Sequence, residues 1–174
     1  MKKRIVSVLL VVMMMSASAL ADDWGFGLGS LTSLFSMEDE GNTYKAGEKA
    51  VIGDYEVTLI NLMESKGSQY EKPGSGNVFV IAEFSIKNKS KEELTVSSIM
   101  CFSAKADDTV YSLSLEADTI AMTSGKIQFD MTIDPGKTGT GIVGYEIPKG
   151  WKQLRITVTP DFYGSDRATF VVDK

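Results

Sequence analysis

Hydrophobic and polar residues alternate most regularly in the stretch Asn77–Asn88. One set of alternating positions is apolar throughout, and the other set starts apolar and becomes polar toward Asn88. A period of two residues is that of a β-strand, whose successive side chains point to opposite faces of the sheet. The pattern therefore predicts a long strand with one buried and one half-buried face, in the middle of a sheet.

Shorter alternating runs fill most of the remaining chain and are separated by turn signals. The turns include Gly53-Asp54, which predicts a hairpin, and Asp134-Pro135-Gly136-Lys137, which favours a type II turn. The runs lie at residues 50–52, 55–64, 94–104, 110–115, 127–133, 138–147, 154–158 and 168–172. No strand–helix alternation is present, so we expect an all-β fold, an antiparallel β-sandwich of about seven to nine strands.

Two segments qualify this pattern. Residues 116–126 are weakly patterned and are predicted to form a loop. The run 138–147 contains Gly139, Gly141 and Gly144, and glycine inside a strand is typical of a bulge or of a close approach by another backbone.

The N-terminal 21 residues have the features of an export signal. Lys2, Lys3 and Arg4 precede an apolar run over residues 5–15, and Ala19-Leu20-Ala21 is a small-x-small cleavage sequence. We expect cleavage after Ala21 and an extracytoplasmic protein, periplasmic or secreted. An uncleaved N-terminal anchor is the alternative. No cysteine follows the cleavage sequence, so no lipid attachment is expected there.

Residues 22–42 differ in composition from the predicted sandwich at 43–174. Apolar side chains alternate there with glycine and serine, and residues 28–37 have the spacing of a short helix, so a helical or irregular segment is expected. The candidate docking residues are Trp24, Phe26, Leu31, Leu34 and Phe35. This tail either docks onto a partner or folds back over an open sheet edge, since edges and apolar patches are usually covered.

The composition argues against several classes of function. The chain has a net charge of −5 and no basic run after the signal, so nucleic acid and anionic lipid are not expected partners. It has no histidine, which excludes Ser-His-Asp and Cys-His catalysis. Its single cysteine, Cys101, is expected to be a small buried apolar residue. We expect no enzymatic activity, no cofactor and no metal centre, although calcium binding by the acidic runs 38–40 and 107–108 stays open.

Two enzymatic alternatives involve polar residues on predicted strands. A Ser–Lys hydrolase could use Ser65 with Lys66, Ser85 with Lys87, or Ser103 with Lys105. A glycosidase would need paired carboxylates such as Glu83 and Asp130. Both acids are more simply interpreted as charges on a solvated sheet face. Because Glu83 has apolar neighbours, we expect it to pair with a basic side chain across the sheet, such as Arg155.

Two stretches carry a family resemblance. The strand Phe79–Ser90, which ends in Asn-Lys-Ser, and the segment Asp134–Pro148, in which a Pro-Gly turn leads into a strand ending in Ile-Pro, resemble a bacterial extracytoplasmic family of unknown function. The resemblance implies a telokin-like, immunoglobulin-like sandwich over about residues 47–158. It also implies a lipoprotein or a secreted protein, and it implies no catalytic residues.

Together these patterns predict an exported, non-enzymatic binding or accessory module of the cell envelope. The candidate binding loops contain Gln69 and Tyr70 in one loop, and Asp161, Phe162 and Tyr163 in another, because binding residues often lie on loops held by a rigid scaffold. The alternative is an interaction or inhibitor protein that docks a partner through residues 24–37. An open edge strand could also pair two copies into a homodimer.

Overall fold

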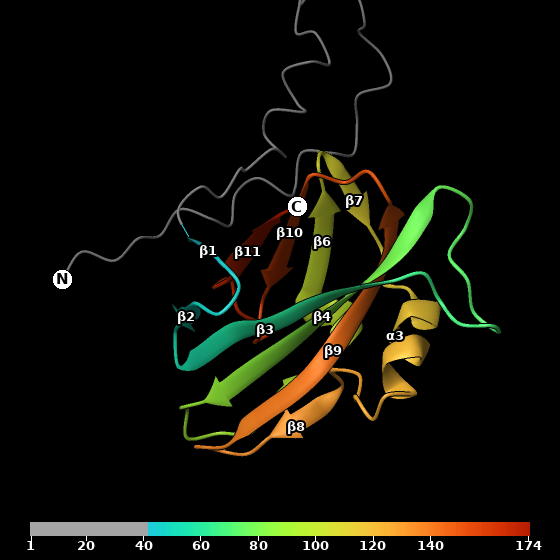
Figure 1. The fold of residues 1–174 in the computed structure, drawn as a ribbon. Helices are drawn as coiled ribbons and strands as arrows, with labels where there is room; N and C mark the ends of the chain where they lie inside the picture. The colour runs from blue at the N-terminus through green and yellow to red at the C-terminus, as the bar shows by residue number, and fades with distance from the viewer. Residues whose placement is uncertain (1–41) are drawn as a thin grey trace, which may run out of the picture. The chain divides into compact units, whose positions relative to one another are not determined.

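The computed structural model describes residues 42–174, which form two β-sheets packed face to face (Figure 1). One sheet has the strand order β1-β11-β10-β6-β7, the other has the order β2-β3-β4-β9, and β5 and β8 form a separate pair. The strands are β1 (Thr43–Tyr44), β2 (Lys49–Ile52), β3 (Tyr55–Ser65), β4 (Asn77–Asn88), β5 (Leu94–Val96), β6 (Phe102–Ala106), β7 (Thr109–Tyr111), β8 (Met131–Ile133), β9 (Thr138–Pro148), β10 (Gln153–Val158) and β11 (Ala168–Asp173). The predicted all-β sandwich is confirmed, and short strands raise the number in the described part to eleven.

Strand β4 is the predicted central strand, with the predicted bounds. It pairs along nearly its whole length with β3 on one side and β9 on the other. Its wholly apolar set of side chains is buried between the two sheets. There Phe84 lies 5.2 Å from Phe102 and 5.5 Å from Phe170, measured between ring centroids. These aromatic contacts join the two sheets into one core.

The helix α3 (Leu115–Met122) contradicts the prediction of a loop over residues 116–126. The Ser114 side chain caps the helix by accepting a hydrogen bond from the Ala117 backbone N–H at 3.2 Å. The helix lies on the outer face of β4 and β9, where it covers Phe79 and Ile81 (Figure 1). This cover explains why the second face of β4 begins apolar.

Gly144 permits this helix to approach the sheet. A Cβ atom added at Gly144 would lie 2.6 Å from the Ala117 Cβ and 2.7 Å from Asp118 Oδ1, which is closer than side-chain atoms pack. Gly139 and Gly141 are crowded in the same way, by Ile133 and by Phe129. The predicted close approaches in this strand are therefore confirmed.

The predicted strand over residues 94–104 is wrong, because the chain divides it between two sheets. It consists of β5, the single-turn helix α2 (Ser98–Cys101) and the start of β6. Asp130 fixes the break by accepting hydrogen bonds from the backbone N–H and the hydroxyl of Ser98, both at 2.8 Å. Asp130 is exposed but precedes β8 rather than lying on a strand face, and the predicted strand 127–133 is reduced to β8. Cys101 is buried, as expected.

The predicted hairpin at Gly53-Asp54 and the predicted type II turn at Pro135-Gly136 are confirmed, although the strands on either side of the second turn belong to different sheets. Strands β2 and β3 pair across the turn at Gly53, and β8 and β9 flank the Pro-Gly turn, where Gly136 has a φ of 74°. Strand β3 has a bulge between Leu59 and Asn61, which leaves Ile60 exposed. None of the helices in the described part of the chain has the length and apolar character needed to cross a membrane.

Candidate functional site

An open groove lies beside the C-terminal half of β11. Strand β1 pairs with β11 only at Thr43 with Thr169 and at Tyr44 with Phe170, and the chain then turns away from the sheet. Strand β11 continues to Asp173. The space left has a volume of about 690 Å³ and is called the β11 groove here. Its lining residues are Thr43, Tyr44, Lys45, Ala46, Glu48, Arg155, Val171, Val172 and Asp173.

The turn after β1 forms one wall of the groove. The Glu48 backbone N–H donates to the Lys45 carbonyl oxygen at 3.0 Å, and the Lys45 N–H donates to Glu48 Oε2 at 2.8 Å. Gly47 has a φ of 84°, which lets the chain reverse there, and its N–H donates to the Leu59 carbonyl oxygen at 2.9 Å. The wall is therefore held in place by its own backbone and by β3.

Arg155 is the residue in the groove with the greatest unused capacity to bind. Its guanidinium carries five N–H donors, and it makes one long hydrogen bond of 3.4 Å, from Nη1 to Gln153 Oε1. Among the described residues no carboxylate pairs with it. The nearest basic residue across the strand pair, Lys105, forms its own ion pair with Asp108 at 3.4 Å.

This finding corrects the predicted partner of Glu83. That carboxylate lies on the outer face of the other sheet and forms an ion pair with Lys126 at 2.6 Å. The expectation of a basic partner is confirmed, and its identity as Arg155 is wrong. Arg155 lies on β10, which is in the sheet that does not contain Glu83.

The acidic residues of the groove already have partners from their own chain. Glu48 accepts the backbone hydrogen bond from Lys45, and Asp173 Oδ1 accepts a hydrogen bond from Gln153 Nε2 at 2.9 Å. The remaining lining combines the apolar side chains of Tyr44, Ala46, Val171 and Val172 with the polar Thr43 and Lys45. The groove thus places apolar side chains beside an arginine that has no carboxylate partner among the described residues, which suits a ligand that carries a carboxylate.

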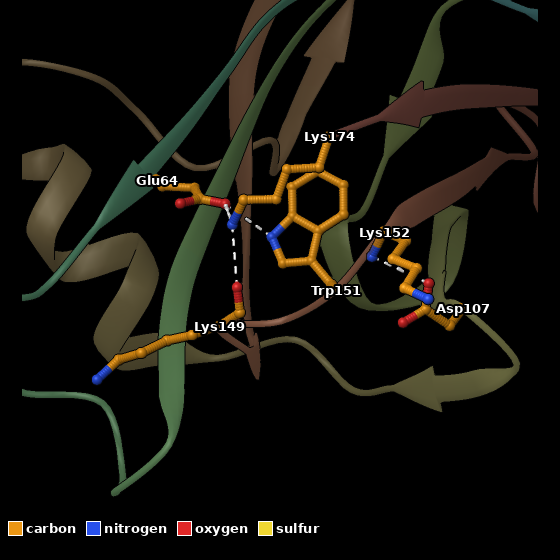
Figure 2. A network of polar contacts seen from close by, with 6 residues as sticks. All are labelled: Glu64, Asp107, Lys149, Trp151, Lys152 and Lys174. Atoms are coloured by element: carbon orange, nitrogen blue, oxygen red, sulfur yellow. Dashed lines mark hydrogen bonds and ion pairs between the residues drawn. The ribbon is translucent and has the colours of Figure 1, made fainter.

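In a second polar cluster, at the end of the sandwich, the main polar groups are hydrogen-bonded to one another (Figure 2). The Trp151 indole N–H donates to Glu64 Oε1 at 2.7 Å, and Lys174 Nζ donates to the same oxygen at 2.6 Å and to the Lys149 carbonyl oxygen at 3.0 Å. The Lys174 ammonium also lies 5.1 Å from the Trp151 ring centroid. The hydrogen bond from Lys174 is the main reason that the pKa of Glu64 is lowered. We call these four residues the Trp151 cluster.

Asp107, also drawn in Figure 2, has a structural role of the same kind. Its Oδ1 accepts the backbone N–H groups of Lys152 and Gln153, each at 3.0 Å, and these hydrogen bonds lower its pKa. Asp107 has a φ of 48°, so it occupies the left-handed region at the turn between β6 and β7. The carboxylate ties this turn to the start of β10.

Asp118 is the one buried carboxylate in the described part of the chain whose two oxygens have no hydrogen-bond partner. It lies on α3 against β9 and is 1% exposed. Burial raises its pKa to about 7, the charge of Asp130 adds to the increase, and the Gly144 backbone N–H opposes it without reaching good hydrogen-bond geometry. The Tyr145 hydroxyl is also buried and unpaired, and burial together with Asp118 raises its pKa.

The structure places the two predicted binding loops at opposite ends of the β3–β4 ladder. Tyr70 is 85% exposed and follows the β3 end at Ser65, in a turn held by the Ser68 hydroxyl. The loop 161–166 lies near the turn between β2 and β3, where Asp166 Oδ2 would be 3.6 Å from a Cβ atom at Gly53. Neither loop contributes a residue to the β11 groove.

The residues of these loops make few contacts with the sandwich. Gln69 is exposed. Tyr163 is 95% exposed and packs edge-on against Phe162, with ring centroids 5.5 Å apart, and its N–H donates to Asp161 Oδ1 at 3.0 Å. The predicted docking residues Trp24, Phe26, Leu31, Leu34 and Phe35 lie outside the described residues.

Sequence reasoning missed the groove and weighed Arg155 only as an ion-pair partner. The alternation over residues 154–158 correctly places Arg155 on the outer face, but an outward arginine is ordinary on a strand. Its special position depends on where β1 leaves β11, and a two-residue strand has no period that a sequence could show.

Solved structures of bacterial proteins share this fold. A candidate lipoprotein (ycdA) from Bacillus subtilis subsp. subtilis str. 168 is 26% identical with a TM-score of 0.60, and the match covers 72% of this chain but only 38% of that protein. The yjhA protein from Bacillus subtilis is 19% identical with a TM-score of 0.61, over 75% of this chain and 99% of that one. An uncharacterized β-sandwich protein from Clostridium difficile 630 is 19% identical with a TM-score of 0.50, over 76% and 94% of the two chains.

No curated protein matches the chain. A family model matches residues 44–169, which include the described strands from the end of β1 to the start of β11. Five of the nine groove residues and three of the four residues of the Trp151 cluster lie within the matched region, whereas Val171, Val172, Asp173 and Lys174 lie beyond its end. By this match, the chain belongs to the family described as "Domain of unknown function (DUF4352)".

Proposed function

We propose that this chain is an exported, non-enzymatic binding module of the cell envelope and that the β11 groove is its binding site. One observation carries the proposal: the Arg155 guanidinium lines a groove of about 690 Å³ and makes a single long hydrogen bond. Ligand sites are typically concave, mostly apolar and supplied with a few polar groups that fix orientation. The β11 groove is concave and places Arg155 beside the apolar Tyr44, Val171 and Val172, although its lining is more polar than that of a typical ligand site.

Export and an envelope location are supported by two observations. The first is the signal-like sequence of residues 1–21, with cleavage proposed after Ala21. The second is that a structural neighbour at 26% identity is a candidate lipoprotein. We include in the proposal the telokin-like form of the sandwich that the sequence resemblance implies.

A binding role without catalysis is supported by the chemistry of the residues present. The chain contains no histidine, the commonest general base of enzymes. The acidic residues of the groove are engaged in hydrogen bonds within the chain, which leaves Arg155 as a binding group rather than a proton carrier.

The proposal is tested by NMR titration of the ¹⁵N-labelled protein, residues 22–174, with N-acetylglutamate at millimolar concentrations. This probe offers a carboxylate without a peptide chain. We expect amide shifts centred on residues 171–173 and on the Arg155 side chain, and their loss in Arg155→Gln. Lys87→Gln is the matched control, because it removes one positive charge from an exposed residue on the other sheet.

Two results would contradict the proposal. One is the absence of shifts in the groove at saturating probe, and the other is an unchanged titration of Arg155→Gln. Deletion of residues 22–42 tests the alternative that the tail carries the binding, because binding in the groove should survive that deletion and docking through the tail should not.

A further inference from the structure

The groove exposes an unpaired length of β-strand backbone. Strand β10 pairs with every residue of β11, whereas β1 pairs only with Thr169 and Phe170. The Thr169 N–H donates to the Asn42 carbonyl oxygen at 3.1 Å, on the β1 side, and the Lys174 N–H donates to the Lys152 carbonyl oxygen at 2.9 Å, on the β10 side. Backbone groups alternate in direction along a strand, so Val171 and Asp173 also direct theirs to the β1 side.

Beyond the end of β1, these outward groups have no neighbouring strand among the described residues. They include the Val171 carbonyl and the N–H and carbonyl of Asp173. Proteins usually protect such edges by covering or shortening them, because an open edge is a template for another strand. In the same structure, the outer edge of β9 is covered, since Leu113 bridges to Tyr145 and Gln128 bridges to Ile142.

We propose that the β11 groove binds an extended acidic peptide segment of a partner protein as an added strand beside β11, with Arg155 binding a carboxylate of that peptide. This inference rests on the proposed function and names the class of ligand. Strand addition supplies affinity through backbone hydrogen bonds and specificity through alternate side chains.

The spacing of strands allows the contact with Arg155. Arg155 is directly opposite Val171 in the β10–β11 register, so its side chain lies on the same outer face of the sheet. An added strand would lie two strand spacings from β10, roughly 10 Å away. The long side chains of an arginine and a glutamate together cover this distance across Val171.

The available donors of the groove, rather than its net charge, favour a peptide that carries a carboxylate, since Lys45 and Arg155 balance Glu48 and Asp173 in charge. Glu48 and Asp173 are engaged by donors of their own chain, whereas Arg155 has no carboxylate partner among the described residues. Bidentate pairing with a carboxylate is the geometry that a guanidinium fits best. Tyr44 and Val172 line the same groove and offer apolar contacts to neighbouring side chains of the peptide.

The test uses a five-residue acetylated and amidated peptide, Thr-Val-Glu-Val-Thr, and the protein of residues 22–174. One control peptide carries glutamine in place of glutamate. A second retains the glutamate but has N-methyl groups on alternate amides, in two versions that together block both hydrogen-bonding registers. Affinities are measured by NMR titration, and the Asp173 amide is followed by hydrogen exchange.

We expect the unmodified peptide to bind more tightly than N-acetylglutamate and to protect the Asp173 amide. Arg155→Gln and the glutamine peptide should each reduce affinity about tenfold, and their combination should reduce it no further, because they remove the same contact. At least one N-methylated version should bind at least tenfold more weakly, and Lys87→Gln should bind as the wild type does.

Equal binding of the N-methylated and unmodified peptides would overturn strand addition, while binding of N-acetylglutamate would still leave the proposed function standing. Failure of every probe would contradict both proposals. A wild-type protein that sediments as a dimer, and that Arg155→Gln converts to a monomer, would identify the occupant as a second copy and would also overturn this inference.

Discussion

Strand β11 ends at Asp173, and the next residue is Lys174; these two charged residues have different surroundings. Asp173 lines the β11 groove, in which Arg155 has one long hydrogen bond. Lys174 belongs to the Trp151 cluster, in which the indole N–H, the ammonium and the Glu64 carboxylate all contact one another. Neighbouring residues of one chain thus belong to a site whose arginine makes one long hydrogen bond and to a site whose main polar groups contact one another.

The difference separates two uses of polar groups. Polar groups that form hydrogen bonds with one another hold segments of the chain together and have few donors or acceptors available for a ligand. A half-buried cation such as Arg155, which has no carboxylate partner among the described residues, is expected to contribute little to stability, since even a formed surface ion pair is typically worth less than about 1 kcal/mol. The comparison predicts that changes in the Trp151 cluster affect folding and that changes in the groove affect binding.

The largest effect is expected for Trp151→Ala. Trp151 is 4% exposed and packs into the main core, so its removal should lower the free energy of unfolding by about 3–5 kcal/mol. Urea unfolding followed by circular dichroism measures this change. Tyr163→Ala, at a residue that is 95% exposed, is the control and should change stability by less than about 0.5 kcal/mol. Similar losses in the two variants would contradict the structural role of Trp151.

The second effect concerns Asp118, a buried polar group that is unpaired, unlike those of the Trp151 cluster. Its pKa of about 7 in the folded protein exceeds the ordinary 3.8, so the folded state retains a proton that the unfolded state releases. Its contribution to stability should be greatest below pH 4, fall between pH 4 and 7, and stay constant above that. The difference in pKa corresponds to at most roughly 4 kcal/mol.

Asp118→Asn should remove this pH dependence and make the protein more stable than the wild type at pH 8. Stability is measured by urea unfolding from pH 4 to pH 8. Glu116→Gln is the control on the same helix: the pKa of Glu116 is lowered, so its contribution should be lost only as the pH falls. A wild-type protein whose stability rises between pH 4 and 7 relative to Asp118→Asn would refute the raised pKa.

A smaller effect is expected for Glu64→Gln. The glutamine carbonyl can still accept the Trp151 indole hydrogen bond, so the main loss is the charge pair with Lys174, worth about 0.5–1 kcal/mol at pH 7. Because the pKa of Glu64 is lowered in the folded protein, the difference from the wild type should disappear as the pH falls through that pKa. Unfolding at pH 7 and pH 3, with Glu93→Gln as an exposed control, tests both statements.

The smallest effect on stability is expected for Arg155→Gln. Its one hydrogen bond is 3.4 Å long, so we expect a change of less than about 0.5 kcal/mol in urea unfolding. The same variant should lose binding in the titrations described above. A loss of stability above about 1 kcal/mol would show that Arg155 supports the fold, and the contrast with the Trp151 cluster would then fail.

The sequence pattern predicted those strands that have one face in the core and the other in a different environment, because such strands show a clear alternation of apolar and polar residues. The bounds of β4 were predictable because its inner face is apolar throughout. The helix α3 was missed because it is short and its packing depends on Gly144, which is 26 residues beyond Asp118 in the chain. The unexplained apolar residues Phe79 and Ile81 were the signal that something covers the outer face.

The remaining errors have the same origin in distant contacts. The break before α2 is fixed by Asp130, which is 32 residues from Ser98, so no local pattern reveals it. The groove exists because β1 leaves the edge after Tyr44. Arg155 has no carboxylate partner among the described residues because of which residues face it in the folded sheet. A side chain that lacks an ion-pair partner can be recognised only when the positions of all possible partners are known, and the sequence does not give those positions.

The close packing at Gly144 has a consequence for the diversity of the family. Any side chain at this position would collide with Ala117 and the Asp118 backbone, so substitution and helix α3 in its present place are mutually exclusive. A family member with a larger residue at the equivalent position must have lost the helix, moved it or filled its place differently. This single position therefore offers a marker for sorting homologous genes by the architecture of one face of their products.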